Sequence, residues 1–357
     1  MKINTFKSKF ILSSIALLSL TLTACSKKQE SKETVKDDPR KKEVVVYSYD
    51  SFVGEWGPGP ELEKLFEQKT GLDLVFVDCG DAVQAYIRAV LEKDAVQADV
   101  IVGIDNNLAD KARASGILEP YTPKDAVSNI SSTVASFAQS ALGNDGLLTA
   151  YDYGHFAMIY DSESSVPAPS SLEDLTKDIY KKKIILMDGR TSTPGLGFVA
   201  WTLAVYGDDY ESYWKALAPN ILTMTSGWSE GWGMFQDGEA PLCVSYTTSP
   251  AYCVEYEDTD RYKTLVFDQG HVLQVEGYGL LKDAPNPDGA KLFMDFLISK
   301  EAQEVLPLTQ WMYPVNPNVE MPESYKTAAP IPAKTLSVDS AKVNSALEKV
   351  SDILLGS

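Results

Sequence analysis

The chain has 357 residues, of which 44% are apolar and 23% charged, with 19 prolines and 23 glycines. This composition is typical of a globular protein and excludes a disordered, collagenous or disulfide-framework chain. The 32 basic and 50 acidic residues give a net charge of −18, which disfavours nucleic-acid binding and favours a small cationic ligand. The length predicts two lobes, each with its own core.

The N-terminal segment has the pattern of a secretory signal. A basic stretch over residues 1–10 precedes an apolar run over 11–20 that is too short for a lasting transmembrane helix. The run ends in Leu-Thr-Ala before Cys25, which resembles the bacterial lipobox. We therefore predict a signal peptide over residues 1–24 and a lipoprotein that acyl chains on Cys25 hold at a membrane, in the periplasm or at the cell surface. An ordinary cleaved signal followed by a chance cysteine is the alternative.

A polar segment follows the predicted lipidation site. Residues 26–42 contain a single apolar residue, Val35, so they cannot bury enough surface to offset their ordering entropy. We predict a flexible tether over residues 25–42. Three cysteines remain beyond it, which allows one disulfide at most. A bond between Cys243 and Cys253 is conceivable, and buried free thiols are favoured over it.

The body alternates strand and helix signals. Strands are expected at 43–49, 72–78, 99–104, 182–187, 221–225 and 242–246. Helices are expected at 61–69, 82–92, 107–115, 195–206 and 289–299. This alternation indicates an α/β protein with parallel sheets, in which ligands gather at the carboxyl ends of the strands.

Two extended, aromatic segments interrupt this alternation. Residues 150–160 and 271–281 are expected to be the two crossings between the lobes. The first lobe is therefore predicted to comprise 43–149 and 272–357, and the second lobe 150–271.

The histidines and one glycine–serine motif bear on metal and hydrolase sites. The two histidines, His155 and His271, lie in unrelated contexts without metal-binding spacing, so no metal site is predicted. The segment 227–231 matches the Gly-x-Ser-x-Gly nucleophile elbow at Ser229. Asp268 and His271 follow in the order that α/β-hydrolases use, so a secreted serine hydrolase is a minor alternative.

The segment Thr191-Ser192-Thr193-Pro194-Gly195 offers hydroxyl and N–H groups at a predicted helix start. Such a start can hold a phosphate, whereas plain capping by Ser192 or Thr193 explains it equally well. The loose match of 195–200 to a dinucleotide fingerprint lacks the acidic residue that closes this motif.

Aromatic residues form the strongest constellation. They lie in predicted loops or at predicted strand ends, among Gly, Pro and Ser, whereas core aromatics fall within an apolar period. This placement predicts a stacking site for a flat cationic ligand, through ring stacking and cation–π attraction. The residues are Tyr49, Trp56, Trp228, Tyr246, Tyr252, Trp311 and Tyr313.

Nine segments resemble the thiamine-binding periplasmic protein family of bacterial ABC importers, with order and spacing kept between Val44 and Pro314. They are 47–52, 56–60, 103–108, 151–154, 190–197, 206–209, 227–230, 245–252 and 311–314. The resemblance implies a type II periplasmic-binding fold, with two α/β lobes joined by a two-crossing hinge. It also implies binding of thiamine and its mono- and diphosphate without catalysis or cofactor, by a monomer that delivers ligand to a permease and its ATPase.

The resemblance also implies the ligand contacts. Trp228 and Tyr252 would face the thiazolium ring, and Tyr49 and Trp311 would flank the aminopyrimidine. Asp81 would accept from the pyrimidine amine. The hydroxyethyl or phosphate end would contact Ser192, Thr193 and Tyr246. A polyamine-binding protein of the same fold is the main alternative, because an acidic body and an aromatic site suit either cation.

Overall fold

The structure is a computed structural model and describes residues 39–356. The predicted signal peptide, Cys25 and residues 25–38 of the predicted tether lie outside the described residues. The last part of the predicted tether is described, and Pro39–Lys42 form a short 3₁₀ helix. The last four residues of the predicted tether are therefore helical.

Strands and helices alternate much as the sequence predicts. The strands are β1 (Glu43–Ser48), β2 (Asp73–Asp78), β3 (Val100–Asp105), β4 (Leu118–Glu119), β5 (Thr149–Asp161), β6 (Ile184–Met187), β7 (Ile221–Thr225), β8 (Leu242–Tyr246), β9 (Tyr262–Leu265), β10 (His271–Leu281), β11 (Tyr313–Pro314) and β12 (Thr335–Leu336). The helices are α1 (Asp50–Val53), α2 (Gly59–Thr70), α3 (Ala82–Leu91), α4 (Ala109–Ser115), α5 (Ala126–Asn129), α6 (Ser132–Leu142), α7 (Thr193–Tyr206), α8 (Tyr210–Leu217), α9 (Trp228–Gln236), α10 (Ser249–Tyr256), α11 (Pro287–Leu297), α12 (Lys300–Gln303), α13 (Leu306–Thr309), α14 (Glu323–Ala328) and α15 (Ser340–Leu355).

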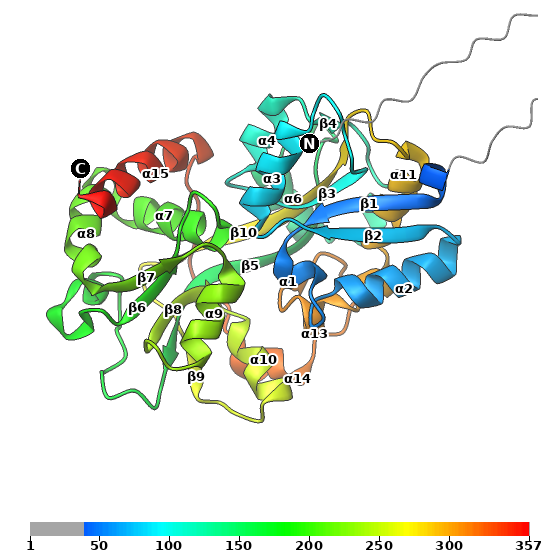
Figure 1. Cartoon of the computed structure of the whole chain (residues 1–357). Coiled ribbons are helices and arrows are strands. Elements are labelled where there is room, and N and C mark those ends of the chain that lie inside the picture. Colours follow the sequence, from blue (N-terminus) through cyan, green and yellow to red (C-terminus); the bar gives the residue numbers. More distant parts are fainter. Residues whose placement is uncertain (1–38, 357) are drawn as a thin grey trace, which may run out of the picture. The chain divides into compact units, whose positions relative to one another are not determined.

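The strands pair in the order β2-β1-β3-β10-β5-β8-β6-β7. Strands β1, β2 and β3 are parallel, as are β6, β7 and β8. The β-branched, largely buried sequence of β1 and the fully buried β3 suit such parallel sheets, which helices cover on both faces. Each parallel group forms the sheet of one lobe (Figure 1).

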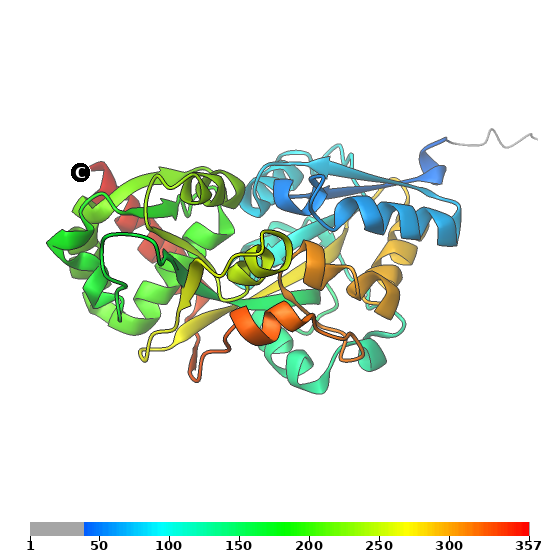
Figure 2. The same cartoon turned by 90° about the horizontal axis from the view of Figure 1, so that it is seen from below.

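Two long antiparallel strands connect the groups. Residues 149–155 of β5 pair with β10, whereas residues 156–161 of β5 pair with β8 and β9. The other side of β10 pairs with β3. Figure 2 shows β5 (green) and β10 (yellow) running through the middle of the body. The predicted crossings at 150–160 and 271–281 coincide with β5 and β10, the two strands between the groups.

The C-terminal helix lies with the second parallel group. Helix α15 packs against α7 and α8 (Figure 1). Both partners belong to the predicted second lobe, 150–271, whereas the sequence predicts residues 272–357, and with them α15, in the first lobe. Its buried face, Val343, Ala346 and Val350, explains the attachment, since these residues repeat at helical spacing.

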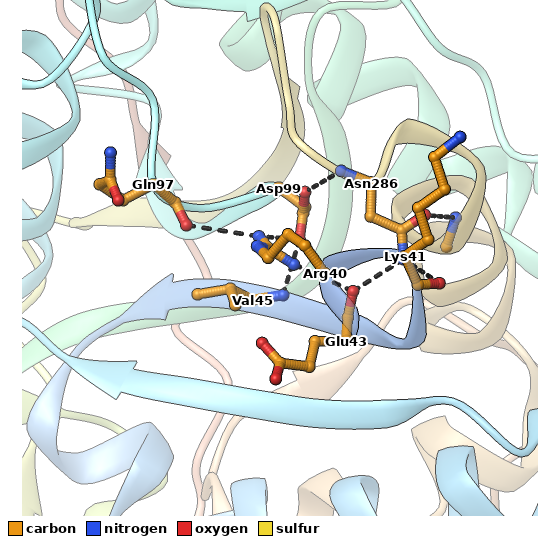
Figure 3. Close-up of polar contacts among 8 residues, drawn as sticks. Arg40, Lys41, Glu43, Val45, Gln97, Asp99 and Asn286 are labelled. Carbon is orange, nitrogen blue, oxygen red and sulfur yellow. Dashed lines mark hydrogen bonds and ion pairs between the residues drawn. The ribbon is translucent and has the colours of Figure 1, made fainter. Parts of the chain in front are cut away.

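A buried carboxylate anchors the start of the body (Figure 3). Asp99 is fully buried and accepts hydrogen bonds from Arg40 Nη2 at 2.7 Å, Val45 N at 2.8 Å and Asn286 N at 2.6 Å. The Arg40 guanidinium also donates to the Glu43 carbonyl at 3.0 Å. These contacts fix the chain where it enters β1.

The three cysteines of the body are free thiols, with Cys243 and Cys253 buried and Cys79 half-buried. This confirms free thiols over the Cys243–Cys253 bond. Across the described part of the chain, no helix has the length and apolar character needed to cross a membrane.

Candidate functional site

A cavity of about 370 Å³ opens where the parallel strands of both lobes end. Its size lies within the range of about 300–1,000 Å³ usual for small-molecule sites. Five strands deliver a lining residue just at or beyond their carboxyl end, as α/β sheets generally do. These residues are Tyr49 after β1, Asp81 after β2, Thr193 after β6, Trp228 after β7 and Tyr246 in β8.

Seven of the eight predicted ligand-binding residues line this cavity. They are Tyr49, Asp81, Thr193, Trp228, Tyr246, Tyr252 and Trp311. Ser192 does not line it, since its side chain is fully buried beside the Asp81 carboxylate. The structure thus brings together residues from 49 to 311, and their ligand contacts remain a prediction.

Two of the aromatic residues lie in helices and not in loops. Trp228 is the first residue of α9, and its indole stacks on Trp232 one turn later, with ring centroids 5.7 Å apart and planes 10° apart. The Trp228 Nε1–H donates to Ser245 Oγ at 2.8 Å, which fixes the ring orientation. Tyr252 lies within α10. The loop assignment was wrong for both, because Gly227 and Pro250 start helices here and do not merely break the chain.

Trp311 has a backbone conformation that glycine usually adopts. Its φ is +59°, and its N–H bonds to the Leu306 carbonyl at 3.1 Å, just after α13. A bulky residue in the left-handed region is strained, and such strain concentrates at functional sites. The conformation directs the indole to the cavity, where it stands edge-on to Tyr252 at 5.4 Å and stacks on Tyr325 at 6.2 Å.

The remaining aromatics of the predicted constellation separate into two places. Trp56 lines the cavity while 81% of it is exposed, so it stands at the mouth. Tyr313 is not among the described residues that line the cavity. It stacks on Tyr153 at 5.5 Å and donates to the Ala329 carbonyl at 3.1 Å, which makes it a packing residue.

Asp81 precedes α3 in the first lobe, and its carboxylate reaches the starts of two helices of the second lobe. Its Oδ1 accepts from the Thr193 N–H at 2.9 Å, at the start of α7, and the Trp228 N–H at the start of α9 also donates to it. Burial raises the pKa of Asp81 to about 6, although these hydrogen bonds oppose the shift. The carboxylate is therefore held by the protein at the cavity, and its implied role as acceptor for a ligand amine remains a prediction.

Acidic groups dominate the charge of the cavity. Its lining includes Asp50, Glu55, Asp81 and Glu276, and among its described lining residues there is no lysine, arginine or histidine. Burial raises the pKa of both Asp50 and Glu276. A lining of this sign attracts cations and repels anionic groups.

The geometry does not support a serine hydrolase. Ser229 lines the cavity, but its hydroxyl bonds to the Asp50 carboxylate. His271 is fully buried, its Nε2 accepts from the Phe267 N–H and its Nδ1 donates to the Phe156 carbonyl, each at 2.8 Å. Asp268 is exposed. With both ring nitrogens held by the main chain, His271 cannot act as a base for Ser229.

The glycines of the loose dinucleotide pattern serve packing. A Cβ at Gly195 would come within 2.4 Å of the Met187 carbonyl, and one at Gly197 within 2.2 Å of the Phe156 ring. Ser192 is the N-cap residue of α7, but its side chain makes no capping hydrogen bond.

His155 bonds to Thr335 at 2.8 Å, as expected for a core histidine. Within residues 39–356, no group of three or more His, Cys, Asp or Glu side chains is arranged to hold a metal ion.

Sequence reasoning missed several lining residues. Trp232 had a signal, because it follows Trp228 by four residues, one helical turn. Glu276 and Gln310 had none, since an acidic residue in a crossing strand and a glutamine in a short turn carry no motif. Only the fold brings them to the cavity.

Comparison with known proteins agrees with this geometry. The profile of the family "Bacterial extracellular solute-binding protein" matches residues 97–341. The thiamine-binding periplasmic protein of Brucella abortus is 40% identical over 300 residues, covering 84% of this chain and 86% of that protein. That of Escherichia coli is 39% identical over 302 residues, covering 84% and 88%.

A solved structure of a periplasmic thiamin binding protein superposes with a TM-score of 0.80 at 36% identity, covering 87% of this chain and 96% of that one. The type II periplasmic-binding fold with two α/β lobes is thereby confirmed, as is a binding protein in place of an enzyme. The chain belongs to the bacterial extracellular solute-binding proteins and, within them, to the family of thiamine-binding periplasmic proteins.

Proposed function

We propose that this protein is the extracytoplasmic receptor of an ABC importer, which binds thiamine in the cavity between its lobes and delivers it to a permease and its ATPase. The observation that carries the proposal is the lining of the cavity, which combines aromatic rings with acidic groups. Thiamine joins a flat aminopyrimidine to a permanently cationic thiazolium ring, so it suits both kinds of lining.

The aromatic side chains supply ring contacts from both lobes. Trp228 and Tyr252 face the thiazolium, and Tyr49 and Trp311 flank the aminopyrimidine. Each contact of a cation with a ring contributes on the order of 0.5–2 kcal/mol. The exposed Trp56 covers the mouth of the cavity once the ligand is bound.

The hydroxyethyl end points toward the starts of α7 and α9, near Thr193 and Tyr246. Thiamine mono- and diphosphate are further ligands, and their phosphate meets the helix N–H groups that Asp81 occupies. Because the lining is acidic and Asp81 holds these donors, thiamine itself binds more tightly than its phosphates.

Binding shifts the protein toward a closed form, since ligand contacts to both lobes exist together only when the lobes are close. We assign 43–149 and most of 272–357 to the first lobe and 150–271 to the second. On its packing, α15 goes with the second lobe. The permease then recognises the closed receptor, which acts as a monomer.

The location follows from the N-terminal sequence and from the relatives, which are named as periplasmic proteins. We propose that residues 1–24 are removed as a signal peptide. Acylation of Cys25 then holds the receptor at the membrane, in the periplasm or at the cell surface. Mass spectrometry of the purified mature chain would show a diacylated Cys25, and an unmodified N-terminus would contradict the anchor.

Two measurements test the ligand. Native mass spectrometry of protein purified without added ligand should show bound thiamine, and calorimetry should show thiamine binding more tightly than thiamine diphosphate. Spermidine serves as the competitor for the polyamine alternative. Displacement of thiamine by equimolar spermidine, or retention of a polyamine through purification, would contradict the proposal.

A further inference from the structure

Three acidic side chains lie side by side on the central strands. Glu276 of β10 is the register partner of Asp105 in β3 on one side and of Asp152 in β5 on the other. Directly opposed residues of neighbouring strands present their side chains on the same face of the sheet. All three are buried, with exposures of 0% for Asp105, 4% for Glu276 and 0% for Asp152, and of these three only Glu276 lines the cavity.

The three carboxyl groups differ in their hydrogen bonds. Asp105 accepts from the N–H groups of Asn107 and Leu108 at 3.0 Å and from Asn107 Nδ2 at 3.1 Å. Glu276 Oε2 accepts from the Tyr49 hydroxyl at 3.1 Å and from Gln310 Nε2 at 3.4 Å. Within residues 39–356, neither oxygen of Asp152 has a donor in bonding geometry, although the Gln310 amide lies beside it, and the Glu276 carboxyl faces it.

A buried carboxylate without a donor is strongly disfavoured, and two adjacent carboxylates do not both ionise. Burial raises the pKa of Asp152 well above its usual value, and repulsion from Glu276 raises it further. Asp152 therefore stays protonated and donates a hydrogen bond to Glu276. The pair then carries one negative charge. That charge lies on Glu276, at the floor of the cavity.

No described cationic group faces Glu276 from the surrounding elements. The carboxyl groups near it are those of Asp81 at the N-cap of α3, Asp105 in β3 and Asp152 in β5. The phenols near it belong to Tyr49, Tyr151 and Tyr246, and burial raises the pKa of each well above its usual value, so they stay neutral. The negative charge at the cavity floor thus lacks a counter-charge from the described lining.

We propose that Glu276 is the counter-charge for the permanent cation of the ligand, and that Asp152 is the positioning residue that holds Glu276 ionised and in place. This inference rests on the proposed function, which supplies the cationic ligand. The bound cation neutralises the single negative charge of the Asp152–Glu276 pair, which a second proton would otherwise neutralise. Binding therefore weakens on acidification, and near the titration of Glu276 it releases protons to the buffer.

The first experiment separates charge from shape. Calorimetry compares thiamine with 3-deazathiamine, in which a neutral thiophene replaces the thiazolium ring. The unaltered protein should prefer thiamine by at least about tenfold, and Glu276→Gln should reduce this preference to less than about threefold. The matched control is Glu119→Gln, which removes one exposed carboxylate from β4, a neighbour of β10 outside the cavity, and should keep the full preference.

The second experiment tests Asp152 through pH. Asp152→Leu removes the donor that stabilises the ionised Glu276, whereas Asp152→Asn keeps a side-chain N–H donor of similar size in its place. The midpoint at which thiamine affinity falls on acidification should therefore move up by about one pH unit or more in Asp152→Leu, and by less in Asp152→Asn. A merely structural role would lower affinity equally at every pH and leave this midpoint in place.

The outcomes distinguish this inference from the proposed function. Tight thiamine binding together with an undiminished preference in Glu276→Gln overturns the inference and leaves the proposed function intact. An unmoved midpoint in Asp152→Leu overturns it as well, and this measurement stands if Glu276→Gln fails to fold. Absence of thiamine binding to the unaltered protein contradicts the proposed function and with it the inference.

Discussion

The carboxylate of Asp81 accepts a hydrogen bond of 2.9 Å from the backbone N–H of Thr193, which lies 112 positions further along the chain. Asp81 is the N-cap residue of α3, yet its side chain makes no capping bond to its own helix. It caps α7 of the opposite lobe instead, where the helix dipole favours a negative charge. A single carboxylate thus connects the two lobes at the edge of the cavity.

This arrangement predicts that the free energy of unfolding depends on pH through Asp81, and that Asp81→Asn removes this contribution. Burial raises the pKa of Asp81 from 3.8 to about 6. Between about pH 4 and pH 6 the folded protein keeps a proton that the unfolded chain loses, so the free energy of unfolding decreases as pH rises. Asparagine does not titrate. The stability of Asp81→Asn relative to the unaltered protein should therefore improve by about 2–3 kcal/mol from pH 4 to pH 7.

Urea unfolding of both proteins at a series of pH values measures this difference. Because the comparison is between two chains that share all other titrating groups, contributions such as those of His155 and His271 cancel. A difference that stays constant over the whole range would show that Asp81 keeps its usual pKa in the fold.

Trp228 is expected to contribute to ligand affinity through its exposed ring face. The other face is covered by Trp232. Trp228→Ala should weaken thiamine binding by about 1–3 kcal/mol, whereas Trp228→Phe should retain much of the stacking. Ser245→Ala, which removes the bond to the indole Nε1 and the bond to Ser249 Oγ, should cost less, about 0.5–1.5 kcal/mol. Calorimetry that finds the same affinity for Trp228→Ala would exclude this ring from the site.

Trp311 allows strain and binding to be separated. Its φ of +59° suits glycine better than alanine, so Trp311→Gly should be more stable than Trp311→Ala by about 1 kcal/mol. Both variants lack the indole and should lose thiamine affinity to the same extent. Thermal unfolding and calorimetry on the two variants measure the two effects. If alanine proved as stable as glycine, the left-handed conformation would carry no strain.

Ser229 is expected to behave as a binding-site hydroxyl without nucleophilic character, because the two nitrogens of His271 are bonded to the main chain. A fluorophosphonate probe should leave the protein unlabelled. Ser229→Ala should bind thiamine with nearly unchanged affinity. Stoichiometric labelling at Ser229 would revive the hydrolase interpretation.

Asp99 is expected to be important for stability and not for binding. It accepts three hydrogen bonds in a fully buried position, so Asp99→Ala should lower the free energy of unfolding by about 3–5 kcal/mol. The control is Glu61→Ala, which breaks an exposed pair with Lys64 and should cost no more than about 0.5 kcal/mol. Urea unfolding with ligand-free protein provides both values. Equal effects of the two substitutions would contradict the anchoring role.

Local patterns predicted most of the architecture. The β-branched run of β1 and the helical spacing of Leu62 and Phe66 in α2 reflect burial along one element, which hydrophobic periodicity reports directly. The crossings β5 and β10 were predicted because they are long, extended and aromatic. The attachment of α15 to α7 and α8 was not, since a surface helix carries no signal for which neighbour it covers.

The sequence by itself determined the α/β class, the two crossings and the segments that line the cavity, because these depend on periodicity and on motifs within short stretches. Only the tertiary structure decided what each side chain meets. It turned Asp81 toward the start of α7, removed Ser192 from the cavity surface, and set Glu276 between Asp105 and Asp152. These relationships join residues far apart in the chain, and the charge of a buried carboxyl group depends on neighbours that only the folded arrangement supplies.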